Sequence, residues 1–222
     1  MAHAGRMWVV SGAQVWSSAD GARWAQASAS APFGGRAKPA VVVHGGRIWL
    51  LGGSAARAEG TARERLYPDQ TTFNDVWSSA DGAAWDLVAA HAPWAERCWA
   101  QAVSFDGRIW LTGGFSNRLC TNYAEAWASA DGTAWEEMPR TPWEGRHEHA
   151  AYAFDGALWV AAGNTWPLLN DVWRLPADAV RATRPAPAPA PEGYEMEAWV
   201  APLGADSVAE LMDLWREVKA PP

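Results

Sequence analysis

The chain has 222 residues, of which 49% are hydrophobic and 19% are charged, a balance typical of a folded globular protein. Its formal net charge of −7 argues against nonspecific binding to nucleic acid or to an anionic membrane, because both attract a positive field. Two cysteines are too few for a disulfide framework or a cysteine-based zinc site. The sequence has no apolar run typical of a signal peptide, and it has no uninterrupted apolar stretch of about eighteen residues that could span a membrane. We therefore expect a cytoplasmic protein with no membrane span.

One unit recurs along the chain at intervals of about 40 to 60 residues, which indicates a propeller or a solenoid. In its clearest copy, residues 97–135, an arginine is followed ten residues later by Gly107 and three residues after that by Trp110. Two further tryptophans, eight residues apart, complete the unit. The matching positions are the arginines Arg36, Arg97 and Arg146, the first tryptophans Trp8, Trp49, Trp110 and Trp159, the second tryptophans Trp16, Trp77, Trp127 and Trp173, and the third tryptophans Trp24, Trp85 and Trp135.

The copies at the two ends of this series are predicted to be partial. Nothing before Gly5 is expected to supply the strand that opens the other units, and Arg181 stands where the last unit would have its third tryptophan. Beyond that unit, the run RPAPAPAPEG predicts an extended linker, and the residues after it predict a strand and a short helix. The predicted boundaries are 1–175 for the repeat domain (partial blade 5–31, blades 32–92 and 93–141, partial blade 142–175), 176–193 for the linker and 194–222 for the tail.

The second unit carries an insert of polar and charged residues between its second and third strands, residues 54–75. Long polar loops within compact repeats are often functional, so we expect this one to project from the fold and to contact a partner. Its candidate contact residues are Arg63, Arg65 and Tyr67. The corresponding insert of the third unit, residues 115–125, is shorter.

The second strand of each unit is apolar on both faces. In RIWLL, Ile48 and Leu50 point to one face, whereas Trp49 and Leu51 point to the other. A sheet of this kind must be covered on both sides, and blades packed around an axis achieve this. The sequence therefore predicts an all-β fold, a partial propeller of about four blades, in which the repeated tryptophans are packing residues.

Two sets of polar residues near the start of the first strand are candidates for a binding surface. Each repeat arginine follows Pro-Phe or Pro-Trp by three residues, which favours a structural role: stacking on that aromatic ring or bonding to carbonyls of the next blade. The alternative is a ring of guanidinium groups that binds a carboxylate. His147 and His149 lie two residues apart on a predicted strand, so both should point to one face and could bind copper or zinc.

The unit resembles the kelch repeat of β-propellers, the family that includes the central domain of galactose oxidase. The pairs Gly52-Gly53 and Gly113-Gly114 match the Gly-Gly that ends the second strand, and Trp85 and Trp135 match the fourth-strand tryptophan. Trp49, Trp110 and Trp159 stand where the family usually has tyrosine. The resemblance covers residues 5–175 and implies a propeller, in this family usually of five to seven blades.

The segments SSADGARW, SSADGAAW and ASADGTAW are similar to the Asp-box turns of sialidases. Ser17, Gly21 and Trp24 match the Asp-box spacing, but the aspartate comes one place late. We interpret these segments as structural turns without a catalytic role.

The function favoured by this reading is a non-catalytic binding module for a protein or glycan partner, with no cofactor. The alternative is an enzyme on a propeller scaffold, either a galactose-oxidase-like copper oxidase or a sialidase-like glycan hydrolase. Convergence of His147, His149, a tyrosine and Cys98 or Cys120 on one point would favour the oxidase. Because the terminal units would each leave an apolar face uncovered, we also expect either self-association through the end blades or poor solubility.

Overall fold

The computed structural model describes residues 1–56, 70–117, 119–138, 140–165 and 167–177. The chain divides into two compact units: Met1–Ala55 with Thr71–Pro185, and Ala56–Gln70 with Ala186–Pro222. The second unit lies almost wholly outside the described residues, as do Arg63, Arg65, Tyr67 and the predicted linker and tail. Within the described part, no helix is long and apolar enough to cross a membrane.

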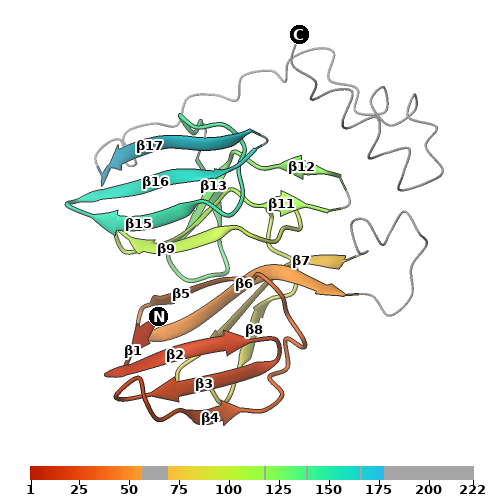
Figure 1. Ribbon diagram of the computed structural model, residues 1–222, viewed down its shortest axis with the longest axis vertical. Helices are drawn as coiled ribbons and strands as arrows, with labels where there is room; N and C mark the ends of the chain where they lie inside the picture. The colour runs from red at the N-terminus through yellow and green to blue at the C-terminus, as the bar shows by residue number, and fades with distance from the viewer. Residues whose placement is uncertain (57–69, 118, 139, 166, 178–222) are drawn as a thin grey trace, which may run out of the picture. The chain divides into compact units, whose positions relative to one another are not determined.

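The first unit is built from antiparallel sheets that follow one another along the chain (Figure 1). Each main sheet takes its strands in sequence order, as a propeller blade does. We number the blades 1 to 4. Blade 1 is β1 (Ala2–His3), β2 (Arg6–Ser11), β3 (Gln14–Ser18) and β4 (Ala25–Ser28); blade 2 is β5 (Ala40–His44), β6 (Arg47–Ala56), β7 (Gln70–Ser79) and β8 (Asp86–Ala89); blade 3 is β9 (Gln101–Phe105), β10 (Arg108–Thr112), β13 (Ala126–Ser129) and β14 (Glu136–Glu137); blade 4 is β15 (Ala150–Phe154), β16 (Ala157–Asn164) and β17 (Leu168–Pro176).

The prediction that the first unit lacks its opening strand is wrong. Strand β1 pairs with β2 through Ala2–Met7 and His3–Arg6, so blade 1 has four strands. The strand is short, and its turn is Ala4-Gly5 rather than Asp-Gly or Gly-Gly, which hid it from the sequence pattern. Both turn residues nevertheless adopt positive φ, as a two-residue hairpin of this twist requires.

Blade 4 has three strands among the described residues, as the missing third tryptophan predicts. The inserts between second and third strands are partly strand themselves, which the sequence did not predict. In blade 2, β6 runs on to Ala56 and β7 begins at Gln70. In blade 3 the insert forms the separate short hairpin of β11 (Phe115–Ser116) and β12 (Thr121–Asn122).

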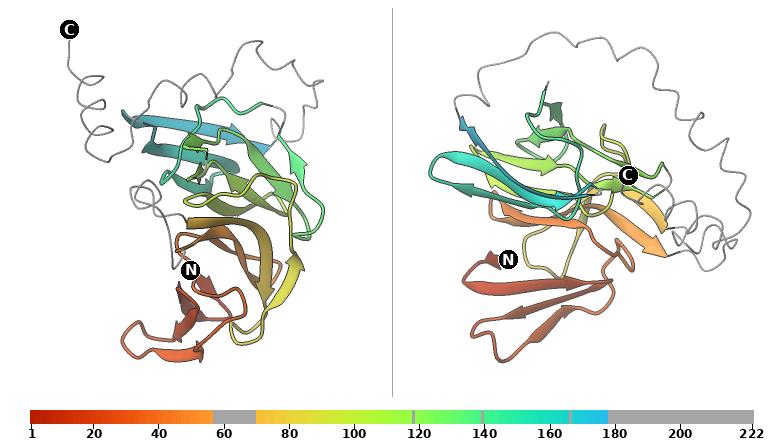
Figure 2. Two further views of the ribbon diagram at one scale, coloured as in Figure 1. Left: turned by 90° about the vertical axis from the view of Figure 1, so that its right-hand side faces the viewer. Right: turned by 45° about the horizontal axis from the view of Figure 1, so that its top comes forward.

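Apolar cores lie between successive blades. The predicted alternation in β6 is confirmed, because Ile48 and Leu50 pack in a cluster with Trp8 and Val15 of blade 1. Trp49 and Leu51 pack on the other side, with Ile109 and Leu111 of blade 3 in the same cluster. A third cluster joins blade 3 to blade 4 through Trp110, Val103, Leu158 and Val160. In the left view of Figure 2, the first sheet (red) lies at the bottom of the described unit and the last strand (blue) lies near its top.

Each first repeat tryptophan is fixed by a hydrogen bond within its own hairpin. The indole Nε1–H donates to the carbonyl five residues earlier, just before the hairpin turn. Burying an indole requires a partner for its N–H, and this carbonyl supplies one in every blade. The donor–acceptor pairs are Trp8–His3, Trp49–His44, Trp110–Phe105 and Trp159–Phe154, at 2.9 to 3.1 Å.

The three Asp-box-like segments form the same turn. In the blade 3 copy, the Ser129 hydroxyl accepts from the backbone N–H of Gly132 at 2.8 Å, and the Asp131 carboxylate accepts from the backbone N–H groups of Thr133 and Ala134. These backbone donors lower the pKa of Asp131 to about 2. The serine that makes the turn in the first copy is Ser18, one place beyond the serine that matched the Asp-box spacing.

Candidate functional site

The repeat arginines lie where their blades' first strands begin, and each binds an acid from its own blade. Arg36 donates two hydrogen bonds to the carboxylate of Asp75, at 2.7 and 2.8 Å. Arg146 does the same to Asp171, at 2.6 and 2.9 Å, and Arg97 donates to Glu125 at 2.5 Å. Bidentate pairs of this type combine charge with fixed geometry.

Backbone carbonyls complete the arginine sites. The Nη1 groups of Arg36, Arg97 and Arg146 donate to carbonyls near the end of the second strand, those of Gly52, Gly113 and Ala162. These carbonyls belong to the same blade, whereas the sequence interpretation placed them in the next one. The three arginines are 4%, 1% and 0% exposed. This burial and pairing match the structural role favoured for them.

The acidic partners were missed by the sequence analysis. Asp75, Glu125 and Asp171 each stand two residues before the second repeat tryptophan, and blade 1, which lacks the arginine, has Gln14 there. An acid thus precedes the second tryptophan only in the blades that have the arginine, and this correlation was the signal in the sequence that could have identified the pairs. Bonding to Arg146 holds the pKa of Asp171 at about 2. Removing either partner would leave a charge without its counterion. Through the carbonyl and the carboxylate, each arginine connects the start of the first strand to the second and third strands.

A left-handed residue follows each arginine by two positions. Lys38, Trp99 and Glu148 have φ values of 53°, 55° and 54°. They are joined across the blades by backbone hydrogen bonds, from the Trp99 N–H to the Lys38 carbonyl at 3.1 Å and from the Glu148 N–H to the Trp99 carbonyl at 3.2 Å. The first strands that follow also contact one another, β5 with β9 and β9 with β15.

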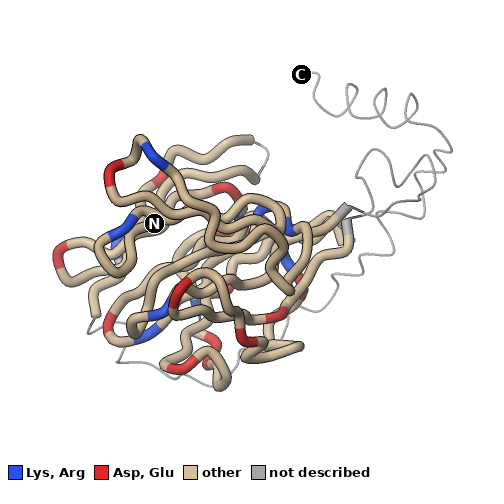
Figure 3. The backbone as a smooth tube through the Cα atoms, turned by 90° about the horizontal axis from the view of Figure 1, so that it is seen from below, with Lys and Arg blue, Asp and Glu red and all other residues tan. Residues whose placement is uncertain are grey.

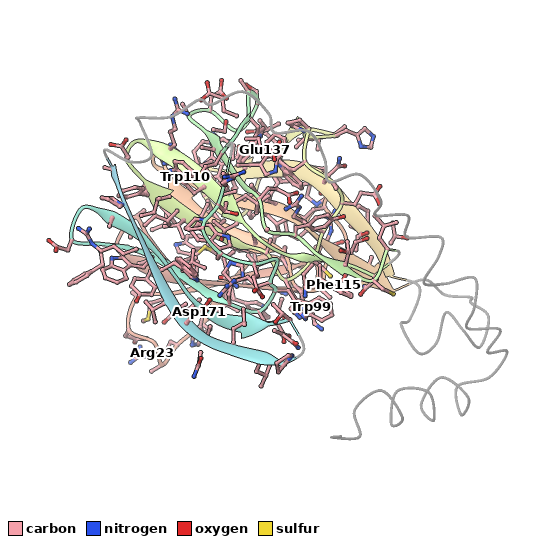
Figure 4. All side chains as sticks on the ribbon, turned by 90° about the horizontal axis from the view of Figure 1, so that it is seen from above. Arg23, Trp99, Trp110, Phe115, Glu137 and Asp171 are labelled. Atoms are coloured by element: carbon pink, nitrogen blue, oxygen red, sulfur yellow. The ribbon has the colours of Figure 1, made fainter. Side chains whose placement is uncertain are left out.

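Side chains around this ladder form one cluster, which we call the entry cluster: Lys38, Trp99, Phe115, His147 and Glu148. The Lys38 ammonium lies 3.4 Å from the centroid of the Trp99 ring, a cation–π contact. The Trp99 ring lies 5.4 Å from the ring of His147 and 6.2 Å from that of Phe115, its neighbour in Figure 4. Lys38 and Glu148 are exposed, and Trp99 is half-buried.

The two histidines do not lie on one strand, which corrects the sequence prediction. Strand β15 begins at Ala150, and the left-handed Glu148 separates the two imidazoles. The Nδ1–H of His147 donates to Asn122 Oδ1 at 2.6 Å, because that oxygen can only accept. His149 instead contacts the Thr112 hydroxyl through Nε2 at 2.9 Å.

Both histidines are buried, and burial lowers the pKa of each. The pKa of His149 falls to about 4, first through burial and then through the nearby Arg146 and His147. Its Nδ1 is buried without a hydrogen-bond partner. Across the described residues, no group of three or more His, Cys, Asp and Glu side chains is placed to hold a metal ion. Burial also raises the pKa of the Cys98 thiol to about 12.

Charges of both signs are interspersed along the described backbone (Figure 3). Within the described residues, we take the entry cluster as the candidate binding surface. Of the residues expected to contribute, His147 lies in this cluster and is itself buried, and Arg36, Arg97, Arg146 and His149 are buried outside it.

The successive antiparallel sheets, with Gly-Gly ends and repeated tryptophans, define a kelch-like β-propeller fold. A solved structure entitled "Structure of YjhT", a kelch-repeat β-propeller protein, superposes with a TM-score of 0.61 at 15% sequence identity. The match covers 79% of this chain and 64% of that one, so this chain spans less than two thirds of the YjhT chain. No family model matches the sequence, and no curated protein does.

Proposed function

We propose that this propeller is a non-catalytic binding module, and that the entry cluster is its contact surface for a protein or glycan partner. The observation that carries the proposal is Trp99. Every described blade with a repeat arginine uses a left-handed residue at this position, so the backbone geometry belongs to the architecture. A bulky residue is poorly suited to that conformation, at a cost of roughly 1–3 kcal/mol. The contacts of the Trp99 ring with Lys38, Phe115 and His147 support a role for the side chain itself.

The chemistry around Trp99 indicates the kind of partner. A half-exposed indole supplies a large apolar contact area, and such residues carry much of the binding energy at interfaces. The Lys38 ammonium lies over its ring, the backbone N–H of the exposed Glu148 bonds to its carbonyl, and the neighbouring His147 is hydrogen-bonded to Asn122. An apolar centre with a mixed polar rim fits a peptide segment or a neutral sugar better than a polyanion.

Binding can be tested with an immobilised glycan array and a displayed random-peptide library. We expect ligands retained by the wild-type chain to bind Trp99→Ala about thirtyfold more weakly, the usual effect of losing a hot-spot residue. Trp24→Ala is the matched control, because Trp24 is 40% exposed in the blade 1 turn, outside the entry cluster. It should bind as the wild type does.

Two results would contradict the proposal. One is that neither the array nor the library yields a ligand. The other is that Trp99→Ala and Trp24→Ala weaken binding equally, because the contact would then lie elsewhere. Circular dichroism of both variants ensures that a loss of binding is not a loss of fold.

A further inference from the structure

Two sheet faces of the described unit have apolar side chains without a neighbouring blade over them. The first is the outer face of blade 4. Val172 of β17 is 60% exposed, whereas the residues at the same repeat position in blades 2 and 3, Val76 and Ala126, are both 0% exposed. Tyr152 and Phe154 of β15 are likewise exposed, where their blade 3 counterparts Val103 and Phe105 are buried.

The second face is on blade 1. It is the side of the blade that, in blades 2 and 3, packs against the preceding blade. Val9 of β2 is 44% exposed, whereas its counterparts Leu50 and Leu111 are buried against the preceding blade. Met7, the counterpart of the fully buried Ile48 and Ile109, is exposed too. Each face is therefore one half of the interface that joins successive blades, and the two halves are different.

Inside the chain, the two halves meet in a specific contact. The strand β2 tryptophan of blade 1, Trp8, packs on Gly82 in the Asp-box-like turn of blade 2, and Trp49 of blade 2 packs on Gly132 of blade 3. The contact is so close that a Cβ added at either glycine would lie 2.2 Å from the ring carbon Cζ3. Only glycine admits the indole at this distance.

At the two ends of this series, one tryptophan and one glycine face no neighbouring blade among the described residues, whereas Trp110 packs in the cluster with blade 4 without such a glycine. Trp159 lies on the outer face of blade 4 beside Tyr152, with ring centroids 6.3 Å apart and planes within 5°. Its N–H is already bonded to the Phe154 carbonyl, so covering its ring would strand no polar group. Gly21 lies in the blade 1 turn, and there the flexible side chain of Met7 fills the place that a tryptophan ring takes in blades 2 and 3.

We propose that the outer face of blade 4 binds the outer face of blade 1 of a second copy of this chain. Trp159 of one copy packs on Gly21 of the next, after Met7 has moved aside, and Val172 and Tyr152 pack towards Met7 and Val9. The partner is a second copy because one chain carries both halves of an interface whose apolar packing it forms three times internally and whose tryptophan–glycine contact it forms twice. The contact is heterologous, so it closes into a ring or continues as a chain of copies.

Three single variants of the full-length chain test the proposal by light scattering coupled to size-exclusion chromatography. Val172→Glu blocks the blade 4 face and Val9→Glu blocks the blade 1 face, each at an exposed site that the fold tolerates. Leu87→Glu is the matched control, since Leu87 is 50% exposed on β8, away from both faces. We expect the wild type and Leu87→Glu to exceed the 24.0 kDa chain mass increasingly with concentration, and each blocked variant to stay at that mass.

The mixture of the two blocked variants decides the orientation. Val9→Glu keeps an intact blade 4 face and Val172→Glu an intact blade 1 face, so an equimolar mixture should give a species of twice 24.0 kDa and nothing larger. Wild type at the single-chain mass throughout the micromolar range would overturn the proposal and favour covering of the faces within the chain. Association that Val172→Glu abolishes and Val9→Glu leaves intact would also overturn it, because two blade 4 faces would then be meeting. These variants leave the entry cluster unchanged, so the outcome is independent of the proposed binding function.

Discussion

Blades 3 and 4 have second strands of nearly the same sequence pattern, yet their tryptophans lie in different surroundings. Trp110 and Trp159 both donate to the carbonyl five residues earlier, at 3.1 and 2.9 Å. Trp110 is buried in the cluster it shares with blade 4, whereas Trp159 is half-buried on a face that no further blade covers among the described residues. The local hairpin therefore sets the position of the indole, and the neighbouring blade sets what that indole contributes to stability.

The largest expected effect separates these two tryptophans directly. Trp110→Ala should lower the free energy of unfolding by about 3–5 kcal/mol, because it empties a large site inside a packed core. Trp159→Ala should lower it by about 1 kcal/mol, since that ring is only partly buried and no further blade among the described residues packs on it. Urea unfolding at concentrations too low for self-association measures both. Equal losses would mean that the blade 4 face is covered as fully as the internal interfaces.

The glycines that receive the tryptophans give a second, smaller contrast. Gly132→Ala places a Cβ 2.2 Å from the Trp49 ring, while Gly21→Ala places it 3.1 Å from the flexible end of Met7. Both glycines have φ of +75°, so the backbone strain of the substitution is the same and cancels. Gly132→Ala should therefore be the more destabilising by about 1–3 kcal/mol, the cost of overpacking. Thermal melting of the pair measures the difference, and identical midpoints would contradict the close contact.

The interface between blades 3 and 4 should also respond to pH, through the contact of Thr112 with His149. The pKa of His149 is about 4 in the folded chain, whereas the ordinary value for histidine, 6.5, applies in the unfolded chain. Between these values the unfolded state binds the proton and the folded state does not, so stability falls as pH falls from 6.5 to 4. The expected slope is about 1.4 kcal/mol per pH unit.

His149→Gln isolates this contribution, because glutamine does not titrate. Its free energy of unfolding should vary less steeply than that of the wild type over this pH range. His91→Gln, at an exposed site, should keep the wild-type slope. A wild-type slope in His149→Gln would show that the acid sensitivity of the fold arises elsewhere.

The propeller could be predicted from the sequence because its signal is repeated and short in range. The first two tryptophans and a glycine at the end of the second strand recur in every unit, and alternation in RIWLL correctly placed Ile48 and Trp49 on opposite faces. The opening strand of blade 1 escaped because two residues carry no periodic pattern. Among the described residues blade 4 has three strands, and its absent third tryptophan is the sequence feature that distinguishes this unit from the others.

The candidate site was less predictable, because its contacts join residues that are distant in the chain. Arg36 and Asp75 lie 39 positions apart, and the recurring acid before the second tryptophan does not by itself identify the arginine as its partner. The assignment of His147 and His149 to one face assumed a regular strand, which the left-handed Glu148 interrupts. Trp99 was overlooked because it occupies a position that its counterparts Lys38 and Glu148 fill with charged residues.

The hydrogen bond that each indole makes within its own hairpin has a consequence for how such a chain folds and grows. A contact over five residues closes a very small loop, so it costs little chain entropy and can form early. Each hairpin therefore presents its ring before the next blade is in place. A duplicated repeat would likewise arrive with both a ring to insert and a glycine to receive one, so units could be added during evolution without remodelling their neighbours.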